Sequence, residues 1–288
     1  MGRMDGSHAI VTGGNSGIGE ATAKLLAAEG AIVSILARRD DEGQRVVREI
    51  QSAGGKAAFF SCNVMSRESV REAVSAAVAQ SGNVTALFNN AGAGFPDTFP
   101  DPDDANFEND LSLNLTSVYR VWSEVWQGMV DAGGGAVVNM SSTAAVVAPS
   151  QSQRSAMPGL PSPGYAAGKA GVEGLTRYMA SIGSPYNIRV NGIRPGQVVT
   201  PLTTRFTPGH HVFEGYFELT QLTPGPGTPE DVANLVVSCS AGTPASSTAR
   251  SSTSMAAQQG RSNVANQRVR ANHGRRTIDA RVNKRARR

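Results

Sequence analysis

The 288-residue sequence has little cysteine and no long hydrophobic run. Its two cysteines, Cys62 and Cys239, are too few for a disulfide framework and lack the spacing of a metal site, so we expect a reducing compartment such as the cytoplasm. No apolar run approaches the ~18 residues that span a bilayer, and the N-terminus lacks the charged and then apolar segments of a signal peptide. We therefore expect neither a membrane protein nor a disulfide-rich secreted module.

Basic and acidic residues are unevenly distributed along the chain. The segment from Arg250 onward holds eleven Lys and Arg against a single acid, Asp279. The whole chain has 27 basic and 23 acidic residues, so the part before Arg250 has 16 basic and 22 acidic residues. The positive net charge therefore belongs to the tail, and the main part of the chain is mildly acidic.

Short apolar, β-branched runs alternate with longer segments of helical spacing. We predict strands at residues 8–14, 31–37, 57–64, 84–92, 136–142 and 188–196. We predict helices at residues 19–30, 40–55, 66–82, 107–133, from about 162, and at 228–239, the last with Thr228 as its N-cap. Strands that alternate with helices of about ten or more residues indicate an α/β fold, a doubly wound parallel sheet of the Rossmann-like type.

The connection between the first strand and the first helix carries the sequence TGGNSGIG, residues 12–19. Gly13 allows the tight turn, Gly17 lets the backbone approach a pyrophosphate, and Gly19 lets the helix pack closely on the strand. Free N–H groups at the start of the helix then face the negative charge. A glycine cluster after a strand can also be a plain structural turn, but its position at the first strand–helix connection favours nucleotide binding.

The end of the second strand distinguishes NADP from NAD, because it meets the adenosine ribose. An acid there binds the 2′-hydroxyl of NAD, whereas a basic residue accommodates the 2′-phosphate of NADP. Ala37 stands at the position of the acid and Arg38 follows it. This favours NADP, with NAD still possible. The alternative is that Arg38 and Arg39 are solvated surface charges.

The sequence YAAGK places Tyr165 and Lys169 four residues apart early in a predicted helix, and therefore on one face of it. A free phenol has a pKa of about 10, too high for a base at neutral pH. A fixed positive charge nearby favours the phenolate and lowers that pKa. A tyrosine tuned in this way can exchange a proton with an alcohol or carbonyl oxygen while a hydride moves at carbon. A Tyr-x-x-x-Lys pattern alone is common by chance.

Five motifs occur in an order and at spacings shared with a known family: TGGNSGIG at 12–19, NNAG at 89–92, NMSS at 139–142, YAAGK at 165–169 and RPGQVVT at 194–200. From about Gly6 to about Val237 the chain resembles a short-chain dehydrogenase/reductase. The resemblance implies an oxidoreductase that transfers a hydride between a nicotinamide cofactor, NADP or NAD, and a secondary alcohol or ketone.

The resemblance also implies roles for individual residues. Tyr165 would be the acid/base, and Lys169 would lower its pKa and hold the nicotinamide ribose. Ser142 would polarise the substrate oxygen, and Asn114 would hold a water that relays protons from Lys169. Ser142 could instead cap a strand end, and Asn114 could be a helix residue satisfied by backbone. The cofactor contacts that the resemblance implies, besides Tyr165 and Lys169, are Gly13, Ser16, Gly17, Ile18, Gly19, Arg38, Asn63, Val64, Asn90, Gly92, Val198 and Thr200.

The chain departs from the family pattern at several positions. Asn63, beside Val64, stands where an aspartate usually contacts adenine, and its carbonyl oxygen can still accept from the adenine amino group. Ser16 replaces a basic residue often found in NADP-using members, so the prediction of NADP depends mainly on Arg38. A long insertion between Ser142 and Tyr165, rich in proline and serine, is predicted to form a loop that shapes the substrate pocket.

Residues 201–227 correspond to the mobile substrate lid of the family. Their aromatic side chains suit a partly apolar alcohol or carbonyl substrate of small to medium size. The segment contains His210 and His211, but no third ligand is evident in the sequence. We interpret them as solvated loop residues and expect no metal site.

The hydrophobic pattern stops at Cys239, where family members continue into a final strand ending in Asp-Gly-Gly. Permitted codons for residues 239–258, read in a shifted frame, can spell such a strand. We therefore predict a dinucleotide-binding and catalytic domain at residues 1–238 and a basic, disordered tail at 239–288 that is a frameshift product. Without the strand, we expect lower stability and weaker assembly into the homo-oligomer that an intact C-terminus would form.

Two other functions stay open at this point. The arginine-rich tail could bind nucleic acid or an anionic surface, although it lacks aromatic residues and starts where the strand is missing. The chain could also be a nucleotide-binding protein with weak or no turnover. The set of Asn114, Ser142, Tyr165 and Lys169 argues against the second alternative. We expect neither a membrane nor a nucleic acid as partner.

Overall fold

The computed structural model describes residues 2–96, 101–148, 150–151, 161–204 and 225–241. Residues 149 and 152–160 of the inserted loop before Tyr165, most of the predicted lid with His210 and His211, and the tail beyond Ala241 lie outside these residues. The frameshift, the pocket-shaping loop and nucleic-acid binding by the tail therefore stay predictions. Within the described part of the chain, no helix has the length and apolar character needed to cross a membrane.

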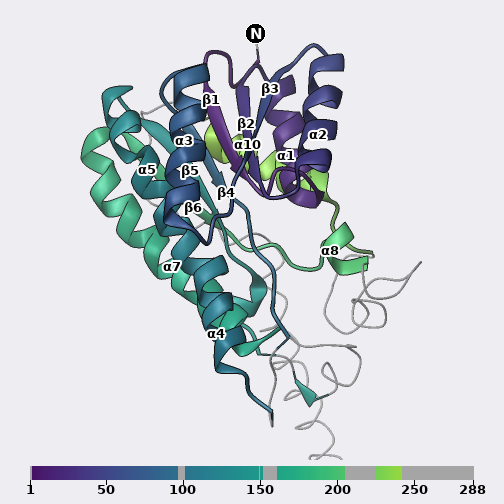
Figure 1. The fold of residues 1–288 in the computed structure, drawn as a ribbon. Helices are drawn as coiled ribbons and strands as arrows, with labels where there is room; N and C mark the ends of the chain where they lie inside the picture. The colour runs from purple at the N-terminus through teal and green to yellow at the C-terminus, as the bar shows by residue number, and fades with distance from the viewer. Residues whose placement is uncertain (1, 97–100, 149, 152–160, 205–224, 242–288) are drawn as a thin grey trace, which may run out of the picture.

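Six parallel strands form one sheet. They are β1 (His8–Thr12), β2 (Ile32–Ala37), β3 (Lys56–Ser61), β4 (Ala86–Asn89), β5 (Gly135–Met140) and β6 (Ile188–Ile193). Their order across the sheet is β3-β2-β1-β4-β5-β6, so the chain builds one half outward from β1 and the other half outward from β4 (Figure 1). This is the doubly wound, Rossmann-like sheet that the sequence predicts. β1 is buried along its whole length, as expected for a parallel strand covered on both faces.

Helices cover both faces of the sheet (Figure 1). They are α1 (Gly17–Ala28), α2 (Asp40–Ser52), α3 (Arg67–Ser81), α4 (Asp104–Leu111), α5 (Ser117–Asp131), α7 (Pro163–Gly183), α8 (Pro201–Thr204) and α10 (Pro229–Ser240). On one face, α1, α2 and α10 pack a core that includes Leu26, Val46 and Val236. On the other face, α3, α5 and α7 enclose a second core. Two apolar layers therefore hold the sheet rigid between them.

The predicted helix at 107–133 is longer and less regular than the sequence pattern indicates. It begins at Asp104 with Asp103 as its N-cap, whose side chain accepts from the Asn106 N–H at 3.1 Å. A π-helical turn at Ser112–Thr116 then joins α4 to α5 without a break in the helix. A π turn takes in one more residue than an α turn, so the side chains on either side of it are rotated relative to an ideal helix.

The last described helix starts as predicted. Thr228 is its N-cap and forms a capping box with Asp231, and Pro229 occupies the first helical position. The helix continues to Ser240, and Cys239 and Ala241 pack against the first core. Arg189 of β6 donates from Nη1 to the Cys239 carbonyl at 2.7 Å and from Nη2 to the Ser240 carbonyl at 3.0 Å. Packing in the structure thus extends two residues past Cys239, where the sequence pattern stops.

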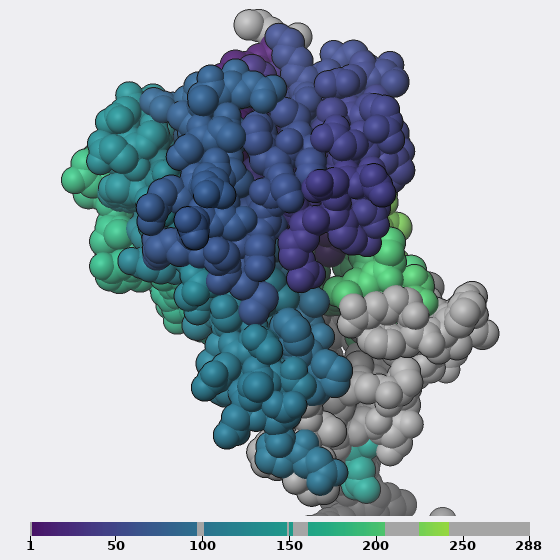
Figure 2. Space-filling view, in the orientation of Figure 1, coloured from purple at the N-terminus to yellow at the C-terminus, as the bar shows by residue number. Residues whose placement is uncertain are grey.

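The carboxyl ends of the strands lie together at one edge of the sheet, the lower one in Figure 1, towards α4 and α8. The segment around α4 projects beyond the sheet on this side (Figure 2). In open α/β sheets, ligands bind at the carboxyl edge where the order of the strands reverses, which here is between β1 and β4. The site residues predicted from the sequence either follow these strand ends or lie in the helical segments beside them.

Candidate active site

The turn after β1 is shaped for close approach of a ligand to its backbone. Gly13 and Gly17 have φ angles of +64° and +54°, a conformation that side chains with a Cβ rarely adopt. A Cβ on Gly19 would lie 2.2 Å from the Gly13 carbonyl oxygen, so only glycine fits there. Ser16 is the N-cap residue of α1 and Ile18 packs against the first core. The N–H groups at the start of a 12-residue helix are therefore presented at the carboxyl edge of the sheet.

The end of β4 is bonded to this turn. The hydroxyl of Thr12 accepts from the backbone N–H groups of Asn90 and Ala91, both at 3.0 Å. The side-chain amide of Asn90 donates to the carbonyls of Thr12 and Gly13 at 3.0 and 3.3 Å. These bonds fix two adjacent strand ends as one surface. The sequence analysis selected Asn90 and missed Thr12, which is buried and works only through its backbone partners.

The segment after β6 also reaches the glycine turn. A Cβ on Gly17 would lie 3.3 Å from the Cβ of Thr200, so Thr200 lies directly against the start of α1. Val198 is buried and pairs with Gly227 in an isolated parallel bridge. The structure therefore brings the predicted Thr200 to Gly17, and Val198 is buried two residues before it.

Two arginines follow β2 at the surface. Arg38 and Arg39 are both exposed. Arg39 donates from Nη2 to the Ser16 hydroxyl at 3.3 Å and pairs through Nη1 with Glu42 at 2.9 Å. The sequence favours Arg38 as the cationic group, but the structure connects Arg39 to the glycine turn. A cationic group therefore lies beside Ser16.

After β3, Asn63 is exposed and Val64 is buried. The Asn63 side-chain oxygen already accepts from the Met65 N–H at 3.1 Å, and its backbone N–H donates to the Ser69 hydroxyl at 3.0 Å. The side-chain oxygen retains a second lone pair, so it can still accept one more hydrogen bond.

Helix α7 carries Tyr165 and Lys169. Ser162 is its N-cap residue and Pro163 its first residue. The Lys169 ammonium lies 5.6 Å from the centroid of the Tyr165 ring and donates to the Met140 carbonyl at 2.9 Å. Lys169 is only 2% exposed. The helical spacing therefore places the phenol and the ammonium together, as the sequence predicts, next to the end of β5.

Glycines let α7 pack closely on α4 and the π turn. A Cβ on Gly164 would lie 2.7 Å from the Cβ of Asp110, and one on Gly171 would lie 2.8 Å from a methyl group of Leu115. A Cβ on Gly168 would lie 3.2 Å from the Cβ of Asn114. These positions share one face of α7, because residues three or four apart on a helix are neighbours. The close contact sets the distance between Asn114 and α7.

The two serines after β5 have different partners. The Ser141 hydroxyl is buried and donates to the Lys169 carbonyl at 3.2 Å and to Glu173 at 3.0 Å. The Ser142 hydroxyl accepts from the Ala144 N–H at 3.2 Å and bonds to the phenol of Tyr165. Ser141 thus holds the helix, whereas Ser142 faces the phenol. Ser142 also caps the short helix at Thr143–Ala145, and its predicted contact with the substrate oxygen stays a prediction.

Asn114 lies in the π turn and is fully buried. Its side-chain N–H₂ group donates to the carbonyls of Ala93 and Asp110 at 2.8 and 3.0 Å. Its side-chain oxygen is buried without a hydrogen-bond partner among the described residues. A Cβ on Gly92 would lie 2.7 Å from that oxygen and 3.0 Å from the Lys169 nitrogen. Both polar atoms therefore border the same space above Gly92, and the backbone satisfies only the amide half of Asn114.

Burial dominates the pKa values of Tyr165 and Lys169. It raises the pKa of the Tyr165 phenol, the hydrogen bond with Ser142 lowers that pKa, and the negative charge of Asp110 raises it. Burial lowers the pKa of Lys169 to about 8. The sequence predicts that Lys169 lowers the phenol pKa. In the structure the hydrogen bond with Ser142 lowers it, and the contribution of Lys169 stays a prediction.

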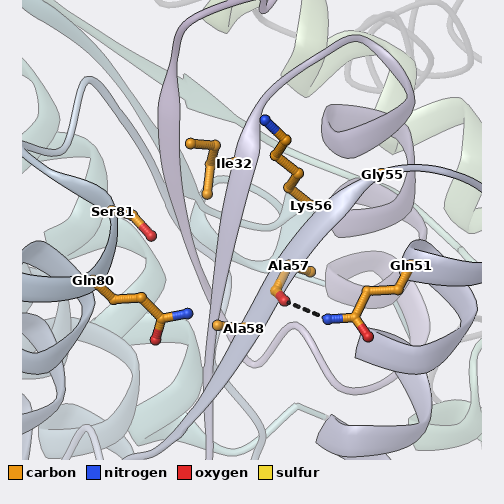
Figure 3. Close-up of a pocket in the computed structure, with 8 residues that line it drawn as sticks. All are labelled: Ile32, Gln51, Gly55, Lys56, Ala57, Ala58, Gln80 and Ser81. Atoms are coloured by element: carbon orange, nitrogen blue, oxygen red, sulfur yellow. Dashed lines mark hydrogen bonds between the residues drawn. The ribbon is translucent and has the colours of Figure 1, made fainter.

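A hollow of about 300 Å³ opens at the opposite end of the sheet (Figure 3). Its lining residues are Ile32, Gln51, Gly55, Lys56, Ala57, Ala58, Gln80 and Ser81. Ile32 and Lys56 begin β2 and β3, so the hollow lies a full strand length from the glycine turn. Lys56 alone carries a charge among these described residues. The hollow lacks a partner to Lys56 for acid/base chemistry among these lining residues, and it belongs to a different part of the molecule.

Comparison with known proteins agrees with this geometry. The family model described as short chain dehydrogenase matches residues 7–210. A 2,5-dichloro-2,5-cyclohexadiene-1,4-diol dehydrogenase from Sphingobium indicum is 36% identical over 210 residues, which cover 71% of this chain and 78% of the relative.

Two solved structures show the same fold. A 7α-hydroxysteroid dehydrogenase complexed with NADH and 7-oxo glycochenodeoxycholic acid is similar with a TM-score of 0.74 and 33% identity, covering 83% of this chain and 89% of the other. An actinorhodin polyketide ketoreductase with NADPH is similar with a TM-score of 0.71 and 28% identity, covering 83% and 92%. The chain therefore belongs to the short-chain dehydrogenase/reductase family of oxidoreductases.

Proposed function

We propose that this protein transfers a hydride between NADP(H) and a secondary alcohol or ketone, with Tyr165 as the acid/base. The observation that carries the proposal is the convergence of Tyr165, Lys169, Ser142 and Asn114 beside the glycine turn. The names of the similar proteins support the substrate class, because they describe a ring diol, a 7-oxo steroid and a polyketide ketone.

The residues present fit a dinucleotide. A Cβ at Gly19 would strike the turn, and Gly13 and Gly17 hold the backbone in a form that exposes N–H groups to a pyrophosphate. The Asn114 oxygen, which has no partner among the described residues, and the Lys169 amine border the space above Gly92. A hydroxyl group of a ribose, or a water molecule, could donate a hydrogen bond to this oxygen and accept one from the amine. When bound, the nicotinamide ring supplies the carbon that accepts or donates the hydride.

The side chains of the chain handle the proton. During alcohol oxidation, the Tyr165 oxygen takes the hydroxyl proton as the carbon–hydrogen bond breaks and its hydride leaves. During ketone reduction, the same oxygen donates that proton to the carbonyl oxygen. The Ser142 hydroxyl orients the substrate oxygen and holds the phenol, and Lys169 with Asn114 returns the proton towards solvent. General acid/base catalysis of this kind contributes about 10²- to 10⁴-fold in rate.

The preference for NADP is proposed from the two arginines after β2. Arg38 and Arg39 are exposed, and Arg39 already contacts Ser16 of the glycine turn. A 2′-phosphate between them would form charge-assisted hydrogen bonds. We expect Arg38→Ala and Arg39→Ala each to raise the KM for NADPH by roughly tenfold or more and to leave the KM for NADH unchanged. Arg48→Ala, which changes an exposed arginine on α2, the helix that follows Arg38 and Arg39, is the matched control.

Tyr165→Phe tests the catalytic role directly. We expect kcat for a secondary alcohol and for its ketone to fall on the order of 10²-fold or more, with NADPH binding retained in a fluorescence titration. Tyr178→Phe is the matched control, because Tyr178 lies on the same helix and is 61% exposed. A folded Tyr165→Phe variant that binds NADPH and turns over at the wild-type rate would overturn the proposal.

A further inference from the structure

A buried carboxylate next to the catalytic residues has no role in the scheme above. Asp110, the last but one residue of α4, is fully buried. Its Oδ1 accepts from the Phe95 N–H at 3.1 Å and from the Asn114 side chain at 3.4 Å. Its Oδ2 accepts from the hydroxyl of Ser162 in a short hydrogen bond. Burying a carboxylate costs free energy unless several donors surround it, and here three do.

The three donors come from three different parts of the site. Phe95 belongs to the segment that follows β4, Ser162 is the N-cap residue of α7, and Asn114 lies in the π turn. Gly164, in the first turn of α7, packs directly on the Cβ of Asp110. One side chain therefore connects the strand end beside the glycine turn, the start of the helix with Tyr165, and the side chain of Asn114.

Asp110 also determines which way the amide of Asn114 points. The N–H₂ group faces the Ala93 carbonyl, the Asp110 carbonyl and the Asp110 carboxylate, all of which are acceptors. A flipped amide would put its oxygen against all three, which is repulsive. The oxygen of Asn114 must consequently face the space above Gly92, beside the Lys169 nitrogen.

We propose that Asp110 is a positioning residue for the proton-transfer site: its carboxylate fixes the Asn114 amide and the start of the Tyr165 helix. The inference depends on the proposed role of Tyr165. Around that phenol, the described part of the chain places Lys169 on α7, Asp110 on α4 and the Ser142 hydroxyl after β5. Of these three groups, Asp110 carries the negative charge.

The sign of the electrostatic effect follows from this arrangement. A nearby negative charge disfavours the phenolate, so it raises the pKa of Tyr165. Alcohol oxidation requires the phenol to act as a base, so its rate rises with pH as the phenol ionises. Removing the charge of Asp110 should move that rise to lower pH. A group with a purely structural role would change the rate or the stability and leave the position of the rise unchanged.

The test compares Asp110→Asn with Ser162→Ala and with Glu108→Gln, which removes an exposed carboxylate from the same helix. The pH dependence of kcat/KM for alcohol oxidation is measured with saturating NADP⁺, together with the Kd for NADPH and the melting temperature. We expect Asp110→Asn to move the rising limb to lower pH. Glu108→Gln should leave it in place. Ser162→Ala, which keeps the charge, should leave the limb in place and lower kcat by roughly tenfold through a looser helix start.

Three outcomes would each contradict one claim: the electrostatic role of Asp110, its positioning role, or the proposed function of Tyr165. If Asp110→Asn folds and its rising limb coincides with that of Glu108→Gln, the electrostatic role is wrong. If Ser162→Ala keeps the wild-type kcat, the positioning role is wrong, and this result does not require Asp110→Asn to fold. Tyr165→Phe tests the proposed function separately from the role of Asp110. Wild-type turnover in that variant would contradict the catalytic assignment of Tyr165, whatever the Asp110 variants show.

Discussion

Gly164→Ala perturbs the contact that sets the position of α7, the helix that carries Tyr165 and Lys169. A Cβ at this position would lie 2.7 Å from the Cβ of Asp110 and 2.8 Å from the carbonyl oxygen of Phe107. Ordinary contact begins at about 3.4 Å, so α7 and α4 would have to separate by roughly 0.7 Å, the difference between 3.4 and 2.7 Å. Backbone and a short side chain oppose the new methyl group, and neither can rotate away.

Two effects follow from that displacement. Overpacking of this kind costs about 1–3 kcal/mol in the free energy of unfolding. The movement also carries Tyr165 away from Ser142, and a misplacement approaching 1 Å costs on the order of 10- to 100-fold in rate. We expect Gly164→Ala to lower both the melting temperature and kcat, while NADPH affinity changes little because the glycine turn is on the other side of the site.

Gly174→Ala is the matched control on the same helix. The nearest atom to a Cβ there is the end of the Arg177 side chain at 3.9 Å, so the methyl group meets no obstacle. Alanine in a helix interior is more favourable than glycine by up to about 1 kcal/mol, so this variant should be more stable than the wild type with unchanged kcat. Thermal denaturation and steady-state ketone reduction measure both quantities. Equal stability and equal kcat in the two variants would refute the packing argument.

Three further predictions concern stability. Burial lowers the pKa of His8. As the pH falls below about 6.5, the unfolded chain therefore takes up a proton before the folded chain does, and the free energy of unfolding decreases. In His8→Gln, chemical denaturation should show a smaller decrease between about pH 6.5 and 5. Thr228→Ala should cost about 1 kcal/mol, because it removes the capping box of α10, and an unchanged urea midpoint would contradict this. Arg189→Met should cost about 1–3 kcal/mol by leaving two carbonyls at the end of α10 without their donor, and a wild-type melting temperature would show that water replaces it.

The elements with a local cause could be predicted from the sequence. The turn at Gly13–Gly19 follows a β-branched strand and precedes a helical pattern. A short stretch of consecutive residues therefore predicts both where the turn lies and which of its positions need glycine. The four-residue spacing of Tyr165 and Lys169 likewise places them on one face whatever surrounds them. Thr228 is recognisable as an N-cap because proline and two acids follow it.

The features that depend on packing could not be predicted. The apolar pattern before and after the π turn at Ser112–Thr116 is typical of an α-helix, so the sequence predicts one continuous helix there. Asp110 looks like a surface acid until α7 covers it. The pKa of Tyr165 also could not be predicted from spacing alone, since burial, Ser142 and Asp110 act on it from other elements. A weak signal for Asp110 existed, because it lies four residues before Asn114.

The widened turn constrains how this protein can change length during evolution. Removing one residue within 112–116 would restore a regular helix and rotate everything after it by about 100° relative to α4. Trp122 and Val125, which face the second core, would then turn towards solvent. Surface loops tolerate gain or loss of residues, but this stretch does not, and neutral drift should preserve its length more strictly than the identity of its residues.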